Sequence, residues 1–226
     1  DTLYWEASYE HDQADIATTR EEWRDRVLEA MRVSVKRRMV ADVPVGVLLS
    51  GGVDSSMVVG LLAESGQTGL MTFSIGFEEA NNEKGDEFVY SDLIAKRFDT
   101  DHHKIFIESD RLLDALPGTI GAMSEPMVSY DNVGFYLLSQ EVAKHIKVVQ
   151  SGQGADEVFG GYHWYPPLAA SNDVTSDYAR VFFDRDRKRM RAHLGDDWLA
   201  EGDPSRELVA GHFARAGAPA SVDKAL

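Results

Sequence analysis

Apolar residues along this chain fall into two patterns: short continuous runs, and longer stretches in which they recur every three or four positions. A run that is apolar at nearly every position is typical of a strand covered on both faces, as in a parallel sheet. These runs predict strands at residues 45–49, 70–75, 103–107 and 147–150.

The stretches between the runs predict helices that connect the strands. The first helix begins after Thr19 and ends before Asp42-Val43-Pro44, because proline disfavours helical geometry in the residue before it. One face is expected to pack on a sheet and the other to be solvated. The packed face is Trp23, Val27, Met31, Val35 and Met39, and the solvated face is Arg24, Arg26, Arg32, Lys36, Arg37 and Arg38.

Four more helices follow in the same way. The helix after residue 52 is expected to end at Gly66 and to bury one side, which is lined by Met57, Val58, Leu61 and Leu62. The other three are predicted at 87–98, 111–123 and 131–145. Pro117 and Gly118 are expected to interrupt the helix at 111–123.

Strands that alternate with helices at this spacing predict an α/β fold, a parallel twisted sheet with helices on both faces. We expect residues 1–20 to be a linker, 21–165 to form the core, and 166–226 to form a charged helical tail. Within the tail, helices are predicted near 178–194 and 207–216. Since ligands of such sheets bind off the carboxyl ends of the strands, the loops that follow the strands are the place to look for a site.

Composition narrows the classes of protein to consider. The 226 residues include 38 acidic and 23 basic side chains, and the net charge of −15 disfavours a nucleic-acid partner. The chain has no cysteine, so disulfides, thiolate metal sites and thiol nucleophiles are excluded within it. No window approaches the ~20 apolar residues of a membrane span, and no secretory leader is visible, so a cytoplasmic protein with no membrane partner is expected. The missing initiator Met favours a piece of a longer chain.

The first candidate site is the turn after the first strand, Ser50-Gly51-Gly52-Val53-Asp54-Ser55-Ser56. Two adjacent glycines let successive amides point at one anion, and the start of the next helix adds unpaired amides and a positive dipole end. No lysine follows the glycines, so this is not a Walker-type loop. The alternative is an ordinary strand–helix turn with a capping residue.

A second glycine-rich turn follows the fourth strand and runs Ser151-Gly152-Gln153-Gly154-Ala155-Asp156-Glu157-Val158-Phe159-Gly160-Gly161-Tyr162. Both turns sit directly after strands of one parallel sheet. We therefore expect them to share one crevice.

Together the two turns carry a specific resemblance. The first resembles the pyrophosphatase loop of N-type ATP pyrophosphatases, and the second narrows the match to asparagine synthetases. Asp42-Val43-Pro44-Val45-Gly46 and Glu125-Pro126 are also similar, and the resemblance covers about residues 21–165. Ser129-Tyr130-Asp131-Asn132 and the residues from Phe135 to Val142 are closer to N-acetylglutaminylglutamine amidotransferases.

The resemblance implies an adenine nucleotide alpha hydrolase-like fold and ATP-dependent amide synthesis. A carboxylate would be activated as an acyl-AMP with release of pyrophosphate and then attacked by ammonia, in asparagine synthesis or on N-acetylglutaminylglutamine. The implied pyrophosphate grip is Ser50, Gly51, Gly52, Asp54, Ser55 and Ser56; the implied adenine contacts are Leu48, Ile75 and Gly76; and Ser151 and Gly152 would lie near the nucleotide and acyl group. Asp54 and Asp156 match magnesium-associated carboxylates, which is the usual ligand type for Mg²⁺.

Gln153 departs from the family, because asparagine synthetases usually have Glu or Asp there to position ammonia and accept its proton. A neutral amide cannot act as that base. Either another carboxylate such as Glu125 or Glu157 takes the role, or the substrate itself does. The resemblance also implies Glu125 and Asp131 as candidate substrate-side residues, and Gln153, Glu125 and Asp156 are the candidate catalytic set.

The resemblance also sets expectations about partners. It implies a glutaminase domain in the same parent chain. The family's downstream phosphate-contacting lysine has no match before Leu226, so we expect this chain to be a fragment of a synthetase domain. A homodimer is a candidate assembly. Two alternatives stay open, a tRNA-modifying ATP pyrophosphatase and a non-catalytic nucleotide-binding module. For His102 and His103 a structural role is favoured over metal binding, since no spaced third ligand accompanies them.

Overall fold

The computed structural model describes residues 2, 4, 13–77, 88–125, 127, 129, 131–183, 185–199 and 201–215. The predicted linker lies largely outside these residues, as do Pro126, Tyr130 and the end of the tail. The chain divides into two compact units, one of residues 12–153 and one of residues 154–226 with 1–11. None of the helices in the described ranges combines the length and apolar character needed to cross a bilayer.

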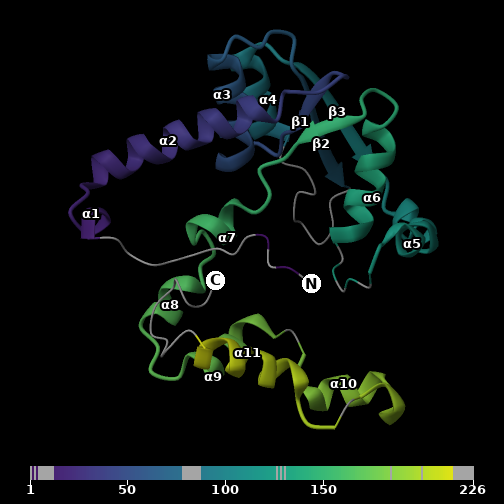
Figure 1. The fold of residues 1–226 in the computed structure, drawn as a ribbon. Helices are drawn as coiled ribbons and strands as arrows, with labels where there is room; N and C mark the ends of the chain where they lie inside the picture. The colour runs from purple at the N-terminus through teal and green to yellow at the C-terminus, as the bar shows by residue number, and fades with distance from the viewer. Residues whose placement is uncertain are drawn as a thin grey trace. The chain divides into compact units, whose positions relative to one another are not determined.

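The first unit is built on a parallel sheet of four strands, as predicted (Figure 1). The strands are β1 (Val45–Leu48), β2 (Met71–Phe77), β3 (Asp101–Ile107) and β4 (Val148–Gln150). Their order across the sheet is β3-β2-β1-β4, and every neighbouring pair is parallel. The strand order therefore reverses between β1 and β4, the topological switch point at which ligands of open α/β sheets bind.

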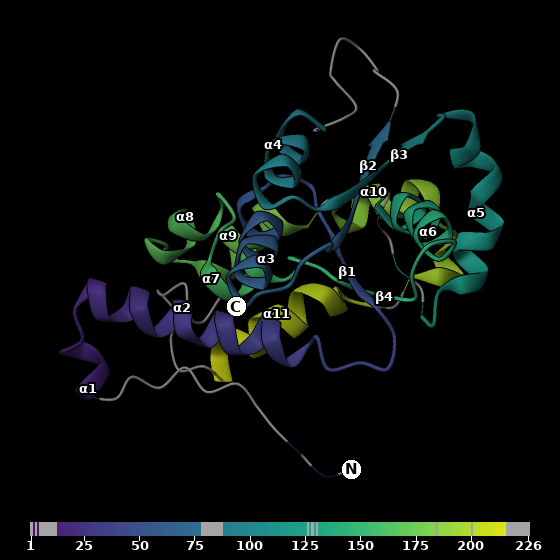
Figure 2. The ribbon, with the colours of Figure 1, turned by 90° about the horizontal axis from the view of Figure 1, so that it is seen from above.

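Helices cover both faces of the sheet, which confirms the predicted fold class. The helices of this unit are α1 (Gln13–Ile16), α2 (Arg20–Arg37), α3 (Val53–Glu64), α4 (Phe88–Phe98), α5 (Asp110–Ala122) and α6 (Asp131–Val142). Figure 2 shows α3 and α4 on one side and α6, backed by α5, on the other. Alternation along the strands supplies each face: Val47 and Leu49 join the core with α3, whereas Leu48 packs with α6.

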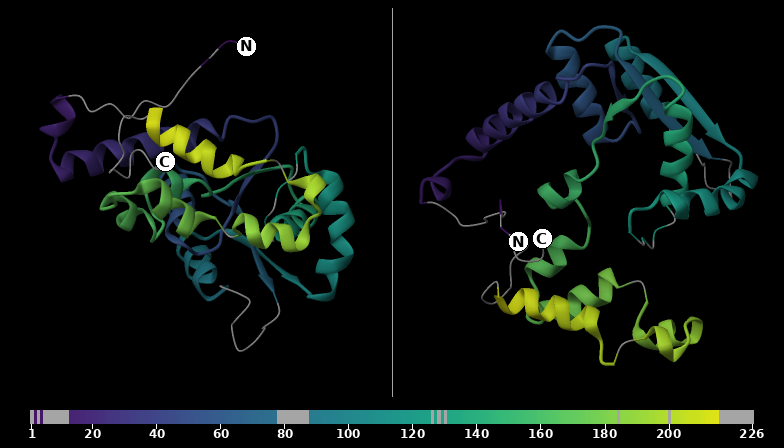
Figure 3. Two further views of the ribbon diagram at one scale, coloured as in Figure 1. Left: turned by 90° about the horizontal axis from the view of Figure 1, so that it is seen from below. Right: turned by 45° about the vertical axis from the view of Figure 1, so that its right-hand side comes forward.

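The first long helix differs from the prediction that one whole stripe packs on a sheet. Val35 is buried and Met31 packs beside it, but Trp23 and Val27 are 42% and 37% exposed. The reason is that α2 packs through its C-terminal half, against α3, while its N-terminal half extends away from the sheet (Figure 3, right). The periodicity of the sequence identified the apolar face of α2 but not how much of that face packs on α3.

Two predictions about the other helices were also wrong. In α3, Met57 is 40% exposed and Val59 is buried in its place, because the buried face is centred on positions 55, 58, 59 and 62. In α5, Pro117 lies inside a continuous helix. Packing of α5 on α6 is close enough that a Cβ at Gly118 would lie 2.5 Å from the Tyr136 hydroxyl oxygen, and this packing outweighs the local cost of the proline.

The second unit contains five α-helices among the residues described. They are α7 (Ala155–Phe159), α8 (Tyr165–Ala169), α9 (Val174–Phe182), α10 (Arg187–His193) and α11 (Pro204–Arg215), with a 3₁₀ turn, η1 (Asp196–Trp198). The helix predicted at 178–194 is instead two helices, because Phe183 is extended and the Asp186 side chain caps the N-terminus of α10. Tyr165, Leu168, Val174 and Phe213 form a small core, and Figure 3 shows α9 and α11 side by side.

Candidate functional site

The first glycine turn leaves the end of β1 with a backbone that excludes side chains. Gly51 has φ +89°, a conformation that L-residues with a Cβ rarely adopt. A Cβ at this position would lie 2.5 Å from the Tyr90 Cβ atom and 2.6 Å from the Ser91 backbone nitrogen of α4. The turn is therefore pressed directly against the start of a neighbouring helix, which explains why glycine occupies this position.

Hydroxyl groups tie this turn to the first turn of α3. The Gly52 amide donates to the Ser50 Oγ atom over 3.2 Å, and the Ser55 hydroxyl donates to the Gly52 carbonyl over 3.3 Å. The Ser50 and Ser55 hydroxyl oxygens are 3.0 Å apart. These short-range bonds hold the turn in one shape before any ligand arrives, which is the preorganisation an anion site needs.

The N-terminus of α3 has the features of an anion-binding site. Its N-cap residue is Gly52, which offers no side-chain cap to the first amides of the helix. The Ser56 hydroxyl oxygen is buried and has no hydrogen-bond partner among the described residues. Unpaired amides at a helix start favour phosphate, and a buried hydroxyl gains a partner when an anion binds beside it.

The second glycine turn meets the first, as the sequence predicts. β4 pairs with β1 in the register Val45↔Val148 and Val47↔Gln150, so the two strands end side by side. A Cβ at Gly152 would lie 2.8 Å from the Ser55 backbone nitrogen and 3.0 Å from the Asp54 carbonyl carbon. The backbone of residues 151–152 therefore lies against the first turn of α3, and the two turns share one edge of the sheet.

The predicted adenine-contacting residues lie at neighbouring strand ends. Leu48 closes β1, and Ile75 and Gly76 are near the end of β2. The side chains of Leu48 and Ile75 pack in the core beneath α6. A ligand at this edge would therefore meet the backbone of these residues, as the resemblance implies.

The candidate catalytic residues are less closely grouped. Gln153 and Glu125 are exposed, and the backbone N–H of Gln153 donates to the Ser151 Oγ atom over 3.2 Å. Glu125 follows α5, and Asp131 opens α6, where its amide donates to the Ser129 hydroxyl oxygen. Asp156 belongs to the second unit, so its pairing with Asp54 stays a prediction. Within the described residues no three acidic or histidine side chains gather closely enough to hold a metal ion by themselves.

The second motif has its own local order around α7. A Cβ at Gly161 would lie 2.0 Å from Oδ1 of the Asp156 carboxylate, so a larger residue there would displace that side chain. The Tyr162 hydroxyl donates to Glu157 Oε1 over 2.8 Å. This hydrogen bond, together with the negative charges of Glu157 and Asp156, raises the pKa of Tyr162 to about 12.

Replacing Glu157 with Gln is expected to lower the pKa of Tyr162 toward 10, because the phenol then no longer donates to a carboxylate and the phenolate no longer faces a negative charge. A raised pKa in the folded state means that this hydrogen bond stabilises the protein below pH 10 and is lost as the pH rises through about 12. Ultraviolet titration of tyrosine ionisation in the wild type and in Glu157→Gln measures the change. An unchanged titration would show that the bond does not persist in solution.

Sequence reasoning missed the residues that back the first turn, Tyr90 and Ser91. Neither belongs to a recognisable motif. The signal that could have found them is the pair of small residues Ser91 and Ala95, four positions apart on the buried face of α4, which marks a face that something approaches closely. The structure shows that the close neighbour of Ser91 is the backbone of Gly51.

Comparison with known proteins adds to this geometry. The family model described as asparagine synthase matches residues 26–223. The chain belongs to this family. The match extends well beyond residue 165, so the asparagine synthase domain includes most of the helical second unit as well as the sheet.

Individual relatives of this asparagine synthase domain are similar over shorter stretches. A protein from Methanocaldococcus jannaschii is 42% identical over 130 residues, which are 57% of this chain and 24% of the relative. Asparagine synthetase [glutamine-hydrolyzing] 1 of Bacillus subtilis is 31% identical over 72% of this chain and 24% of its own length. The chain thus spans about a quarter of the length of these relatives. A solved NH3-dependent NAD synthetase from Campylobacter jejuni, 16% identical, aligns over 85% of this chain and 83% of its own with a TM-score of 0.42, too distant to support a conclusion.

Proposed function

We propose that this domain activates a carboxylate with ATP and converts it to an amide. A carboxylate does not react with ammonia until one of its oxygens becomes a good leaving group. Transfer of AMP to that oxygen provides one: the carboxylate oxygen bonds to the α-phosphorus, the bond to the β-phosphate bridge breaks, and pyrophosphate leaves. Ammonia then attacks the acyl carbon, AMP leaves, and the nitrogen loses a proton.

The observation that carries this proposal is the close approach of Gly152 to the backbone of Asp54 and Ser55. It brings the turn after β4 onto the uncapped start of α3, at the point where the strand order reverses. In the proposal the amides and hydroxyls of residues 50–56 hold the β- and γ-phosphates as one leaving unit. Leu48, Ile75 and Gly76 meet adenine through their backbone, and Ser151 and Gly152 lie beside the reacting phosphate.

The residues present also fit a magnesium ion that accompanies ATP. Asp54 offers a hard carboxylate oxygen at the edge of the phosphate grip, and Asp156 is the second candidate ligand. Mg²⁺ is commonly held by one or two carboxylates and the phosphates themselves, so two carboxylates would be enough. When bound, the ion neutralises charge on the leaving pyrophosphate.

The neutral side chain of Gln153 bears on the identity of the acyl substrate. Because a neutral amide cannot take the proton from ammonia, Glu125, Glu157 or a group on the substrate takes it. We propose aspartate or N-acetylglutaminylglutamine as the acyl substrate, and the amide at position 153 favours the larger one. Membership in the asparagine synthase family and the net charge of −15 both favour amide synthesis over tRNA modification.

Ammonia is proposed to come from glutamine, hydrolysed by a glutaminase domain elsewhere in the parent polypeptide. The relative in Bacillus subtilis is named glutamine-hydrolyzing, and this chain corresponds to about a quarter of it. The proposal places the parent protein in the cytoplasm, with a homodimer as the candidate assembly.

An ATP–pyrophosphate exchange assay on the natural polypeptide that contains this chain tests the proposal. Labelled pyrophosphate should enter ATP only when the correct acyl substrate is present, because exchange requires reversible formation of the acyl-AMP. Aspartate and N-acetylglutaminylglutamine are offered separately. Exchange with one of them identifies the substrate, and the absence of exchange with both would overturn the proposed chemistry.

A further inference from the structure

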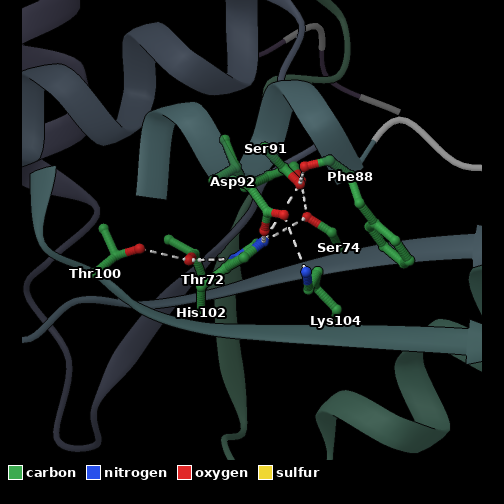
Figure 4. Close-up of polar contacts among 9 residues, drawn as sticks. Thr72, Ser74, Phe88, Ser91, Asp92, Thr100, His102 and Lys104 are labelled. Carbon is green, nitrogen blue, oxygen red and sulfur yellow. Dashed lines mark hydrogen bonds and ion pairs between the residues drawn. The ribbon is translucent and has the colours of Figure 1, made fainter. Parts of the chain in front are cut away.

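A buried polar network lies behind the first glycine turn, centred on the imidazole of His102 (Figure 4). The His102 side chain is 9% exposed and sits on the face of β3 that is turned toward α4. Its Nδ1 atom is 2.8 Å from Thr72 Oγ1, and its Nε2 atom is 3.4 Å from Ser74 Oγ and 3.3 Å from Ser91 Oγ. One side chain thus joins β3 to β2 and to α4.

The protons of this network run in one direction. The Ser74 hydroxyl donates to the Leu49 carbonyl, and the Ser91 hydroxyl donates to the Phe88 carbonyl over 3.3 Å. Since a serine hydroxyl has one proton, both oxygens then face His102 with lone pairs, and we assign the ring hydrogen to Nε2 on this basis.

The other side of the ring follows from this assignment. Neutral Nδ1 is then an acceptor, so the Thr72 hydroxyl donates to it. Thr72 Oγ1 in turn accepts from the hydroxyl of Thr100, 2.8 Å away.

The two serines on the Nε2 side of His102 both lie next to the first glycine turn. The Leu49 carbonyl that receives the Ser74 hydroxyl belongs to the residue directly before Ser50. On α4, the Ser91 backbone nitrogen is one of the atoms that would lie 2.6 Å from a Cβ at Gly51. His102 therefore holds the strand that enters the turn and the helix against which the turn is pressed.

Charged groups around His102 act in both directions. Burial is the largest effect and lowers the pKa of His102, and Lys104 and His103 act with it. The Asp92 carboxylate, whose Oδ1 atom is 3.9 Å from Nε2, and the backbone of Thr72 act against it. Asp92 is also bonded to Lys104 over 3.0 Å, which offsets part of its charge. A lowered pKa favours the neutral ring, in agreement with the proton directions above.

We propose that His102, as the neutral Nε2–H tautomer, is a positioning residue that sets the conformation of the first glycine turn. It touches no substrate; it acts through Ser74 and Ser91. The consequence for ATP rests on the function proposed above, whereas the effect on the turn does not.

Two substitutions separate the hydrogen bonds from simple packing. In His102→Gln the amide nitrogen can occupy the position of Nε2 and donate to both serines, whereas in His102→Asn the shorter amide cannot reach them. His103→Asn is the matched control, because His103 is the next residue on the same strand but stacks on Phe73, on the opposite face of the sheet, with ring centroids 5.1 Å apart.

Hydrogen–deuterium exchange of the unliganded chain at pH 7 measures the turn directly. Peptides covering residues 49–56 are expected to exchange about tenfold faster in His102→Asn, the size expected for one unmade buried hydrogen bond, and at nearly the wild-type rate in His102→Gln and His103→Asn. Equal exchange in His102→Asn and wild type would overturn the proposal, as would equal acceleration in the Asn and Gln variants of His102.

Two further readouts keep the inference testable if a variant fails to fold. Imidazole ¹⁵N shifts of the wild type at pH 7 should report the neutral Nε2–H tautomer; an Nδ1–H tautomer or a charged ring would contradict the assignment. In the ATP–pyrophosphate exchange assay, His102→Asn should raise the KM for ATP about tenfold, with kcat within about twofold of the wild type. If the wild type shows no pyrophosphate exchange, the proposed function fails, and deuterium exchange and the tautomer still decide the role of His102.

Discussion

Replacing Gly51 with alanine is expected to lower the free energy of unfolding by about 3 to 5 kcal/mol and to abolish ATP binding. Two costs add at this position. The backbone has φ +89°, and the new Cβ would meet the backbone of α4 at 2.6 Å, where a shift of one flexible side chain cannot relieve the overlap. Urea unfolding followed by circular dichroism measures the first effect, and calorimetric titration with MgATP measures the second.

Gly66 is the matched control for this experiment. It has the same φ of +89°, but a Cβ there would have no heavy atom within 4 Å. Gly66→Ala should therefore cost only the backbone strain, about 1 kcal/mol, and leave ATP binding unchanged. If both variants lose the same stability, the close approach of the turn to α4 is not what requires glycine at position 51.

Replacing Asp54 with asparagine is expected to reduce pyrophosphate exchange about a thousandfold while changing stability by less than about 1 kcal/mol. Asparagine keeps the size of the side chain but removes the charge that we propose to hold Mg²⁺. The loss should lie mainly in the rate of exchange at saturating ATP. Exchange kinetics over a range of Mg²⁺ concentrations, together with urea unfolding, measure both effects.

Asp110 provides the comparison, since it lies in the first turn of α5 as Asp54 lies in the first turn of α3. Asp110→Asn removes the same favourable interaction with a helix dipole. However, α5 follows β3, at one edge of the sheet, whereas the glycine turns follow β1 and β4, toward the other edge. It should lose a similar small amount of stability and no exchange activity. Full exchange activity in Asp54→Asn would show that this carboxylate does not hold the metal.

Much of the fold could be predicted from residue patterns because the relevant interactions are local. Apolar runs marked the four strands to within two residues at either end, and Gly66, with its positive φ, ends α3 where expected. The shared edge of the two glycine turns also followed from the chain alone. Carboxyl ends of adjacent parallel strands must lie together, and Gly152 does contact the first turn of α3.

Other features depended on what lies opposite a residue, which no periodicity records. Trp23 and Val27 continue an apolar stripe, yet they are 42% and 37% exposed, because among the described residues α2 packs on α3 through its C-terminal half. Pro117 stays within a helix because the neighbouring helix stabilises it. The division of the chain after Gln153, which assigns Asp54 and Asp156 to different units, likewise depends on tertiary contacts and not on local sequence.

The sequence by itself determined the order of the elements, the two glycine turns and the family to which the chain belongs, since each is encoded in consecutive residues. The tertiary structure decided why Gly51 must be glycine and what holds the turn in place. Tyr90, Ser91 and His102 come from α4 and β3, distant in sequence from the turn. Only the packing of α4 and β3 against β2 brings the backbone of Tyr90 and Ser91 close to Gly51 and puts His102 within hydrogen-bond distance of Ser74 and Ser91.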